Sequence, residues 1–464
     1  MRFALGLSAL AAALAAVAAA PPDPLAAIAS ANGHPAAIHF HASGMRVVEG
    51  RAVSTSLDVL GVTELVRRCV AGACGGVWFD GTRQWTFGLN DVALPEDVDA
   101  GVLTQRTLAA ISSYAFAESG FRRAGGSVVA EGAGRWRVRA PEGLELVAIV
   151  DPATATLRRV ETAEGRSVAT YAHEVRAGGG VFALQRGGAY EYGPLDEVSA
   201  AAGPLGPPPG VTASFAGDDT LALAAQPIPI VPCVIAGRHV RCLLDSGATP
   251  SAMTLTVAEA LNLEPHGELE IRGIGRFATG FVEAGPLELG SARFSSARFA
   301  VVPPTGSAPF DVVVGSDLLA RVRLVLDRAR GTARIIAPGG SATGTAVALT
   351  FHTGSPIVQT MLGPQGARAL LDTGDQAIVS FGYGAYRDGP QWKVVGRGQA
   401  RGMGGADDML TVEVPDVRIG PLAIGGARAT VRRTQGLAHV GIGLWDRYVV
   451  DLDEAAGRVW FSPR

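Results

Sequence analysis

An internal repeat in the C-terminal half of this 464-residue chain constrains its fold more than any other feature. In the first copy, Pro229 precedes a strand-like run that ends at Asp245-Ser246-Gly247. In the second, Pro356 precedes a similar run that ends at Asp372-Thr373-Gly374. The spacing from the proline to the aspartate is identical in the two copies. Two copies are too few for a solenoid, so we expect a pair of similar β units related by a pseudo-twofold axis.

Later landmarks in each copy support the same arrangement. An apolar run that closes on glycine follows each aspartate at nearly the same distance, at Val313-Val314-Gly315 in the first copy and at Gly441-Ile442-Gly443 in the second. A strand-like hairpin then finishes each unit, over residues 323–336 and 448–461. Short alternating runs of this kind are typical of β-strands. We therefore predict that each copy forms one β lobe.

The rest of the chain divides around a segment rich in proline and glycine. Residues 201–210 read AAGPLGPPPG, which has no apolar period and is typical of a linker. Before it, short alternating runs predict a β-rich domain with a candidate helix over residues 103–119. We therefore predict a mainly β protein with a signal peptide at 1–20, an α+β N-terminal domain at 24–200, a linker at 201–218 and lobes at 219–340 and 341–464.

Composition and the first residues bear on location. Charged residues make up 18% of the chain and the formal net charge is -3, which argues against disorder and against a basic surface for nucleic acid. Arg2, the apolar stretch 3–17 and the small residues 17–20 predict a secretory signal, although the stretch could instead stay in place as a membrane anchor. No later apolar run approaches the roughly 18 residues that a membrane span needs. We expect a periplasmic or secreted protein with no span after signal removal.

Four cysteines form two close pairs, Cys69 with Cys74 and Cys233 with Cys242. For the second pair, a two-residue turn at Gly237-Arg238 would set Cys233 directly opposite Cys242 in a hairpin. An exported protein permits disulfides, so we predict one in each pair, with small buried thiols as the alternative for the second.

The residues at the end of each repeated strand make chemical sense together. Glycine permits close approach of two loops, and the hydroxyl of Ser246 or Thr373 can hydrogen-bond the opposing loop. If the loops meet, Asp245 and Asp372 lie so close that one proton is shared between them. The charged carboxylate can then act as a general base on a water molecule while the protonated one polarises a carbonyl, without a metal or cofactor.

Residues from about 221 to 464 resemble the pepsin/retropepsin clan of aspartic peptidases, with a unit length closer to the retroviral type. The resemblance rests on Leu243-Leu244-Asp245-Ser246-Gly247, on Leu370-Leu371-Asp372-Thr373-Gly374 and on the later glycine elements. It implies that Asp245 and Asp372 are catalytic, that Ser246 and Thr373 lock the two loops, and that Gly247 and Gly374 allow their approach. It also implies flaps over the substrate, for which the candidates are Gly273, Gly275, Gly402 and Gly404.

These observations predict an exported, monomeric aspartic endopeptidase that acts on peptides or proteins, needs no cofactor or metal and binds no nucleic acid. The alternative is a non-catalytic periplasmic protein that binds a peptide or lipid with the same cleft and an N-terminal half-barrel. Asp375 follows the second motif where the first has Ala248. It could raise the pKa values of the dyad or simply point into solvent.

The N-terminal domain is less informative. Its strands between residues 147 and 182 resemble the half-barrel of bacterial lipoprotein-carrier proteins, which could hold an acyl chain or peptide. The alternative is a structural or propeptide-like domain packed on the lobes. His39 and His41 could share one face of a strand, but no other ligand lies at suitable spacing, so we expect no metal site there.

Overall fold

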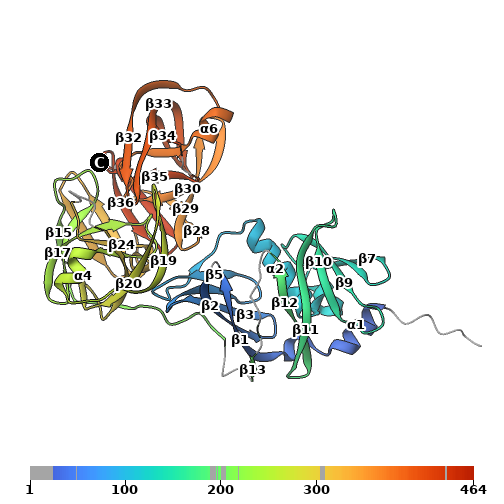
Figure 1. Cartoon of the computed structure of the whole chain (residues 1–464). Helices are drawn as coiled ribbons and strands as arrows, with labels where there is room; N and C mark the ends of the chain where they lie inside the picture. Colours follow the sequence, from blue (N-terminus) through green and yellow to red (C-terminus); the bar gives the residue numbers. More distant parts are fainter. Residues whose placement is uncertain are drawn as a thin grey trace, which may run out of the picture.

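The structure is a computed structural model in which strands dominate, as predicted for a mainly β protein (Figure 1). It describes residues 24–48, 50–188, 195, 197–199, 205–217, 219–303, 309–433 and 436–464. The predicted signal peptide and residues 201–204 and 218 of the predicted linker lie outside the described residues.

The N-terminal part contains two antiparallel sheets. The first has the strand order β13-β1-β2-β3-β4-β5-β6, with bounds β1 His39–Val48, β2 Arg51–Leu60, β3 Thr63–Val70, β4 Ala73–Phe79, β5 Gln84–Phe87, β6 Leu94–Pro95 and β13 Glu197–Ser199. The second has the order β12-β11-β10-β9-β8-β7, with bounds β7 Ser127–Gly132, β8 Arg135–Arg139, β9 Glu145–Val150, β10 Leu157–Glu161, β11 Ser167–Ala177 and β12 Gly180–Gly188. Short helices α1 Pro24–Asn32 and η1 Pro35–Ala37 precede them.

The predicted N-terminal helix is displaced from its expected position. Helix α2 spans Ala100–Ser112, because the Asp99 side chain caps it by accepting hydrogen bonds from the first free backbone N–H groups. Tyr114 has a left-handed φ of 56° and ends the helical run that we had extended to residue 119. The remaining residues form η2 Ala115–Ala117 and α3 Ser119–Arg123.

Each copy of the repeat forms its own sheet. The first-copy sheet has ten strands in the order β14-β22-β21-β16-β17-β24-β18-β23-β20-β19, with bounds β14 Ala213–Phe215, β16 Ile230–Ile235, β17 Arg238–Asp245, β18 Ala252–Thr254, β19 His266–Arg272, β20 Arg276–Ala284, β21 Leu287–Leu289, β22 Ala292–Phe294, β23 Ala297–Val302 and β24 Val312–Gly315. Helices α4 Leu255–Ala260 and α5 Ser316–Leu319 accompany it. Strand β14 shows that the chain already joins this sheet at residue 213, near the end of the predicted linker.

The second-copy sheet has eight strands in the order β28-β29-β30-β35-β31-β34-β33-β32. Their bounds are β28 Thr350–His352, β29 Ser355–Leu362, β30 Gln365–Asp372, β31 Val379–Gly382, β32 Lys393–Gly402, β33 Gly405–Ile419, β34 Leu422–Arg432 and β35 Ala438–Gly441, with helices α6 Tyr383–Asp388 and η3 Ile442–Asp446.

A third sheet joins the two copies, in the order β15-β26-β25-β36-β37-β27. It contains β15 Thr220–Ala222, β25 Arg323–Asp327, β26 Thr332–Ile336, β27 Thr345–Ala348, β36 Tyr448–Asp453 and β37 Arg458–Pro463. The two predicted terminal hairpins are its centre, where Leu324 pairs with Leu452. Buried Arg323 bonds both carboxylate oxygens of Asp451 across this junction, at 2.8 and 2.7 Å. One hydrophobic core runs through both lobes and this sheet, so the lobes are held in a fixed relation.

Both cysteine pairs form disulfides, as predicted, but our register for the second pair is wrong. Cys69 pairs directly with Cys74 across β3 and β4. Cys233, however, lies opposite Val240. The turn falls on Ala236-Gly237, where both residues have positive φ (49° and 79°), as a two-residue hairpin turn of type I′ requires. The disulfide therefore runs diagonally to Cys242 with Cα atoms 5.9 Å apart.

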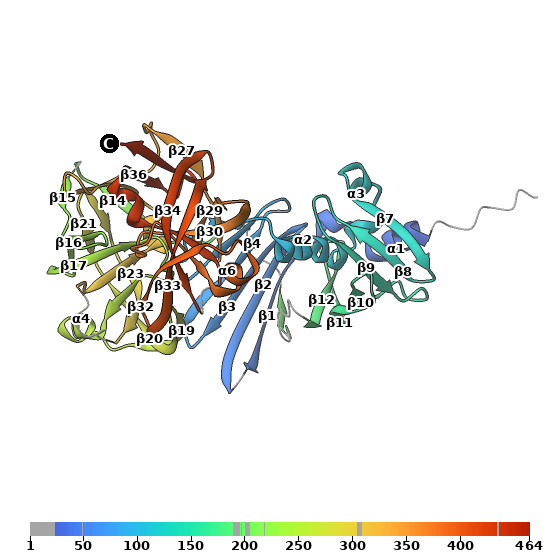
Figure 2. The ribbon, with the colours of Figure 1, turned by 90° about the horizontal axis from the view of Figure 1, so that it is seen from above.

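The first N-terminal sheet has the pair of lobes on one side and the second N-terminal sheet on the other (Figures 1 and 2). The Asn90 side chain donates to Asp317 Oδ2 at 2.7 Å and accepts from the backbone N–H of Arg298 at 2.7 Å in the first lobe. Glu96 forms a parallel bridge with Phe351 of the second lobe. The N-terminal part therefore contacts both lobes. No helix within the described residues is long and apolar enough to cross a membrane.

Candidate active site

The two repeated aspartates end equivalent strands. Strands β17 and β30 each lie between an antiparallel partner and a parallel one, and in these parallel pairs Asp245 lies opposite Gly315 and Asp372 opposite Gly441. The structural equivalent of Gly315 is therefore Gly441, two residues before the Gly443 that we had matched to it. The buried apolar residues of these strands are Cys242, Leu243 and Leu244 in β17 and Ala369 and Leu371 in β30, and their burial fixes the register of each strand before its aspartate.

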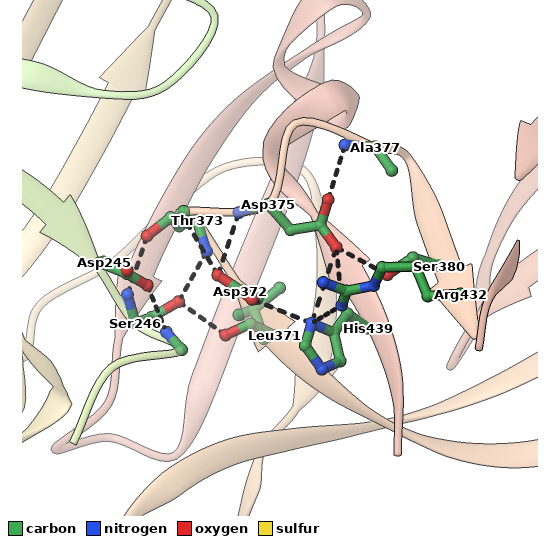
Figure 3. Close-up of polar contacts among 12 residues, drawn as sticks. Asp245, Ser246, Leu371, Asp372, Thr373, Asp375, Ala377, Ser380, Arg432 and His439 are labelled. Atoms are coloured by element: carbon green, nitrogen blue, oxygen red, sulfur yellow. Dashed lines mark hydrogen bonds and ion pairs between the residues drawn. The ribbon is translucent and has the colours of Figure 1, made fainter. Parts of the chain in front are cut away.

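The hydroxyls next to the aspartates hold the two loops together through a symmetric network of hydrogen bonds (Figure 3). The backbone N–H of Ser246 donates to Thr373 Oγ1 at 2.9 Å, and the N–H of Thr373 donates to Ser246 Oγ at 3.1 Å. Each hydroxyl then donates to a carbonyl of the opposite strand, Ser246 to Leu371 O at 2.6 Å and Thr373 to Leu244 O at 2.7 Å. Both side chains are almost fully buried, so these bonds do not compete with solvent.

Gly247 and Gly374, which follow the two hydroxyl residues, each leave room for the carboxyl group of the opposite loop. A β-carbon on Gly247 would lie 2.5 Å from Cγ of Asp372, and one on Gly374 would lie 2.5 Å from Oδ2 of Asp245. Neither glycine has a positive φ. Close approach, not backbone conformation, is what requires glycine here.

Asp245 and Asp372 form a coupled carboxyl pair. Burial, the charge of Asp372 and a hydrogen bond with Asp372 raise the pKa of Asp245 well above its usual range. Asp245 Oδ1 accepts one backbone hydrogen bond, from Gly247 at 3.0 Å. Asp372 Oδ1 accepts two, from Gly374 at 2.9 Å and Asp375 at 3.0 Å. The surroundings therefore favour one proton shared by the pair, held more readily by Asp245.

A polar cluster adjoins Asp372 and contains a residue that the sequence analysis did not single out. His439 Nδ1 lies 2.9 Å from Asp372 Oδ2 and 3.6 Å from Asp375 Oδ2. Ser380 Oγ donates to Asp375 Oδ2 at 2.6 Å, and Arg432 Nη2 lies 3.8 Å from the same oxygen. Burial acts to lower the pKa of His439, but its hydrogen bonds with Asp372 and Asp375 raise that pKa to about 9.

Asp375 does not point into solvent, which was one of the two roles we considered for it. Its side chain is 16% exposed and faces His439, Ser380 and Arg432. Burial acts to raise its pKa, but hydrogen bonds from His439, Ser380 and the Ala377 N–H lower the pKa of Asp375 to about 2. Its negative charge is thus compensated locally.

The same cluster has a spacing that a metal ion would accept. Asp372, Asp375 and His439 each offer a ligand atom, and these atoms lie within 4.8 Å of one another. The Arg432 guanidinium, however, already faces both Asp375 and His439, with its Nη2 3.4 Å from His439 Nδ1. Because Arg432 and a protonated His439 already balance the charges of two carboxylates here, we interpret the cluster as a network of ion pairs.

The two glycine-rich segments form hairpin tips that meet. Gly273 and Gly275 lie at the turn between β19 and β20, and Gly402 and Gly404 at the turn between β32 and β33. The Gly275 N–H donates to Met403 O at 3.2 Å, and Met403 packs against the apolar cluster that includes Leu243 and Val313. The tips therefore lie on the side of the lobes where Asp245 is located.

Comparison with known proteins agrees with this geometry. Residues 231–318 match the family model described as aspartyl protease. The match covers the first motif, with Asp245, and extends past the glycine element at Gly315. No curated protein matches the chain. The matched segment is thus similar to aspartyl proteases over the first lobe.

The repeat predicted the residues of both loops, but it did not single out His439. We had aligned Gly443 with Gly315, whereas the strand register aligns Gly441. With the correct alignment, His439 stands where the first copy has Val313. A histidine in an otherwise apolar strand, next to the dyad strand, was the available signal.

Proposed function

We propose that this protein is an aspartic endopeptidase. Its active site would be formed by the carboxyl groups of Asp245 and Asp372, which together hydrolyse the peptide bonds of a substrate. The observation that carries the proposal is the crossing of the two loops, in which each carboxyl group occupies the space left by the opposite glycine. Two carboxyl groups held this way share one proton, so one can activate a water molecule while the other polarises the scissile carbonyl. The family match of residues 231–318 supports the same reaction class.

The hairpins β19–β20 and β32–β33 supply the proposed flaps. Their tips are bonded to each other through Gly275 and Met403, so a polypeptide substrate would have to part them to reach the dyad. Exclusion of water by such closure would strengthen the electrostatic interactions at the carboxyl groups. The shared central sheet already brings both aspartates together in one chain, so we propose that the protein acts as a monomer.

Export is part of the proposal. The signal-like residues 1–20 and the two disulfides fit a periplasmic or secreted enzyme, because disulfides persist in oxidising compartments. The N-terminal sheets are proposed to serve as a docked domain, and their likeness to a carrier half-barrel remains a hypothesis. An acyl-chain binding assay on the purified protein tests that likeness.

Cleavage of an unstructured protein such as casein tests the enzyme proposal. We expect turnover over some range of pH, inhibition by a statine-type transition-state mimic, and loss of turnover in Asp245→Asn and in Asp372→Asn. Asp388→Asn is the matched control, since Asp388 is exposed and pairs only with the neighbouring Arg387 among the described ion pairs. Turnover that survives either dyad substitution would refute the assignment. Binding of the mimic without turnover would instead favour the non-catalytic binding protein.

A further inference from the structure

The two lobes differ sharply in the shell around their aspartates. Strand registers place Ser380 opposite His439 where the first lobe has Ala252 opposite Val313. By the same registers Arg432 takes the place of Val302. Asp375 takes the place of Ala248, because each lies three residues after the repeated aspartate of its own lobe. In the first lobe all four positions belong to, or pack against, one apolar cluster.

This difference shows that the fold does not need charged groups at those positions. Ala252, Val302 and Val313 are almost fully buried, so apolar packing is sufficient at these positions of the first lobe. Burying a carboxylate and two cations at the equivalent positions of the second lobe has a desolvation cost that hydrophobic residues of similar volume avoid. The charges therefore need a reason other than stability, and His439 brings them to the dyad, because its Nδ1 lies 2.9 Å from Asp372 Oδ2.

We propose that His439 is a positioning residue whose imidazolium, held between Asp372 and Asp375, keeps Asp372 as the ionised base of the dyad and leaves the shared proton on Asp245. The inference rests on the proposed peptidase function. Asp372 Oδ2 lies 2.9 Å from His439 Nδ1, which donates to it when the ring is protonated, and two backbone N–H groups donate to Asp372 Oδ1. Within the described residues a single backbone N–H, that of Gly247, donates to Asp245. Hydrogen bonds to a carboxylate favour its charged form.

The groups that face His439 come from several elements. Asp372 ends β30, Asp375 lies in the following loop, and Arg432 ends β34. Ser380 of β31 orients Asp375 by donating to its Oδ2 at 2.6 Å. When Asp245 is protonated, the two anions Asp372 and Asp375 are balanced by the two cations of this cluster. Asp375 thus keeps the imidazole charged and in place, and Arg432 limits the net negative charge.

The arrangement predicts how activity depends on pH. The active form needs one ionised carboxylate in the dyad, so protonation of the dyad sets the acidic limb of kcat/KM. A cation beside a carboxylate favours its charged form, and an anion beside it opposes that form. Removing the charge of His439 must therefore move the acidic limb to higher pH. Removing the charge of Asp375 must move it to lower pH.

The first experiment compares the pH profiles of kcat/KM for the full-length protein, His439→Asn and Asp375→Asn. Asparagine at 439 keeps a donor near the position of Nδ1 but removes the charge. We expect its acidic limb to rise by about one to three pH units, with at least about a tenfold loss of kcat/KM below the wild-type limb. The limb of Asp375→Asn should fall. Limbs that move in the same direction, or do not move, would overturn the proposal, because a merely structural role predicts no opposite shifts.

The matched control is His352→Asn. His352 Nδ1 also lies beside a carboxylate, 3.2 Å from Glu96 Oε1, but at the interface with the N-terminal part. Its acidic limb should equal that of the wild type. Chelators such as EDTA and phenanthroline should also leave activity unchanged, and a loss that added Zn²⁺ restores would make the cluster a metal site and overturn the proposal.

A second readout does not depend on activity. The imidazole NMR signals of His439 can be assigned by their disappearance in His439→Asn and then followed with pH. We expect a titration midpoint near 9 in the wild type and a lower midpoint in Asp372→Asn. A wild-type midpoint at or below the ordinary value of 6.5 would overturn the inference. If wild-type protein cleaves nothing at any pH, the peptidase proposal fails, while this titration still shows whether His439 is charged between Asp372 and Asp375.

Discussion

Gly247 and Gly374 each lie against the aspartate of the opposite lobe, so that a β-carbon on either would come within 2.5 Å of a carboxyl atom. The relationship is reciprocal and involves rigid neighbours, because both loops are locked by the buried hydroxyls of Ser246 and Thr373. The loops can hardly move apart to admit an extra carbon. The distance between the carboxyl groups is therefore the property most sensitive to small changes here.

Gly374→Ala should reduce kcat by about a hundredfold or more, because a displacement of about 1 Å of a catalytic group costs that much. Peptide cleavage assays measure the effect. The control is Gly384→Ala in helix α6, where an added carbon meets nothing within 4 Å. Full activity of Gly374→Ala would show that the two carboxyl groups need not be this close.

Thr373→Val should destabilise the protein. It leaves the Ser246 N–H without its acceptor and the Leu244 carbonyl without its donor, both in buried positions, at a cost of about 1–3 kcal/mol each. Urea denaturation measures the change in free energy of unfolding. Thr373→Ser keeps the hydroxyl and should stay close to the wild type. Equal destabilisation by both substitutions would mean that the methyl group, not the hydrogen bonds, matters.

Glu454 should make the protein less stable as pH rises. Burial raises the pKa of Glu454 well above its usual range, and nearby Asp317 and Asp453 act in the same direction. The single hydroxyl proton of Ser316 has an acceptor in Ser246 O, at 3.0 Å, so a protonated Glu454 can donate to Ser316 Oγ from 3.0 Å away. The folded state therefore holds a proton that the unfolded state releases above the ordinary pKa of 4.5, and stability is lost as pH rises from there through the raised pKa.

Glu454→Gln tests this dependence, since the amide can still bond Ser316 but does not ionise. Its free energy of unfolding, relative to the wild type, should increase as pH is raised from 4 towards 8. A relative stability that is constant over this range would mean that Glu454 does not change its charge in the folded protein.

Asn90→Ala should loosen the contact between the N-terminal part and the first lobe. The substitution removes one donor to Asp317 Oδ2, which keeps the Ser251 N–H, and it leaves the part-buried Arg298 N–H without its acceptor, at a cost of about 1–3 kcal/mol. We expect earlier unfolding in urea and faster proteolysis between the two parts. Thr82→Ala on an exposed turn is the control and should change stability by less than about 0.5 kcal/mol. An unchanged proteolysis pattern in Asn90→Ala would show that other contacts hold the interface.

The sequence by itself determined the mainly β class, the Asp-Ser/Thr-Gly residues of the candidate site and the hairpins at residues 323–336 and 448–461. These features are local: strand patterns repeat every two residues, and a repeated motif is visible without coordinates. Even so, local reasoning placed the β16–β17 turn one position too late and so shifted the strand pairing, because only the backbone shows that Ala236 adopts a left-handed φ.

The tertiary structure alone decided which strands from distant positions lie side by side. Pairing of β30 with β35 brings His439 to Asp372 although the two residues are far apart in the chain, and packing of Asn90 on Asp317 joins the N-terminal part to the lobes. Register between strands is set by which faces are buried, and that depends on the whole fold. The charged shell around one aspartate and the apolar shell around the other follow from that register, so a linear repeat showed the pair of aspartates but not their difference.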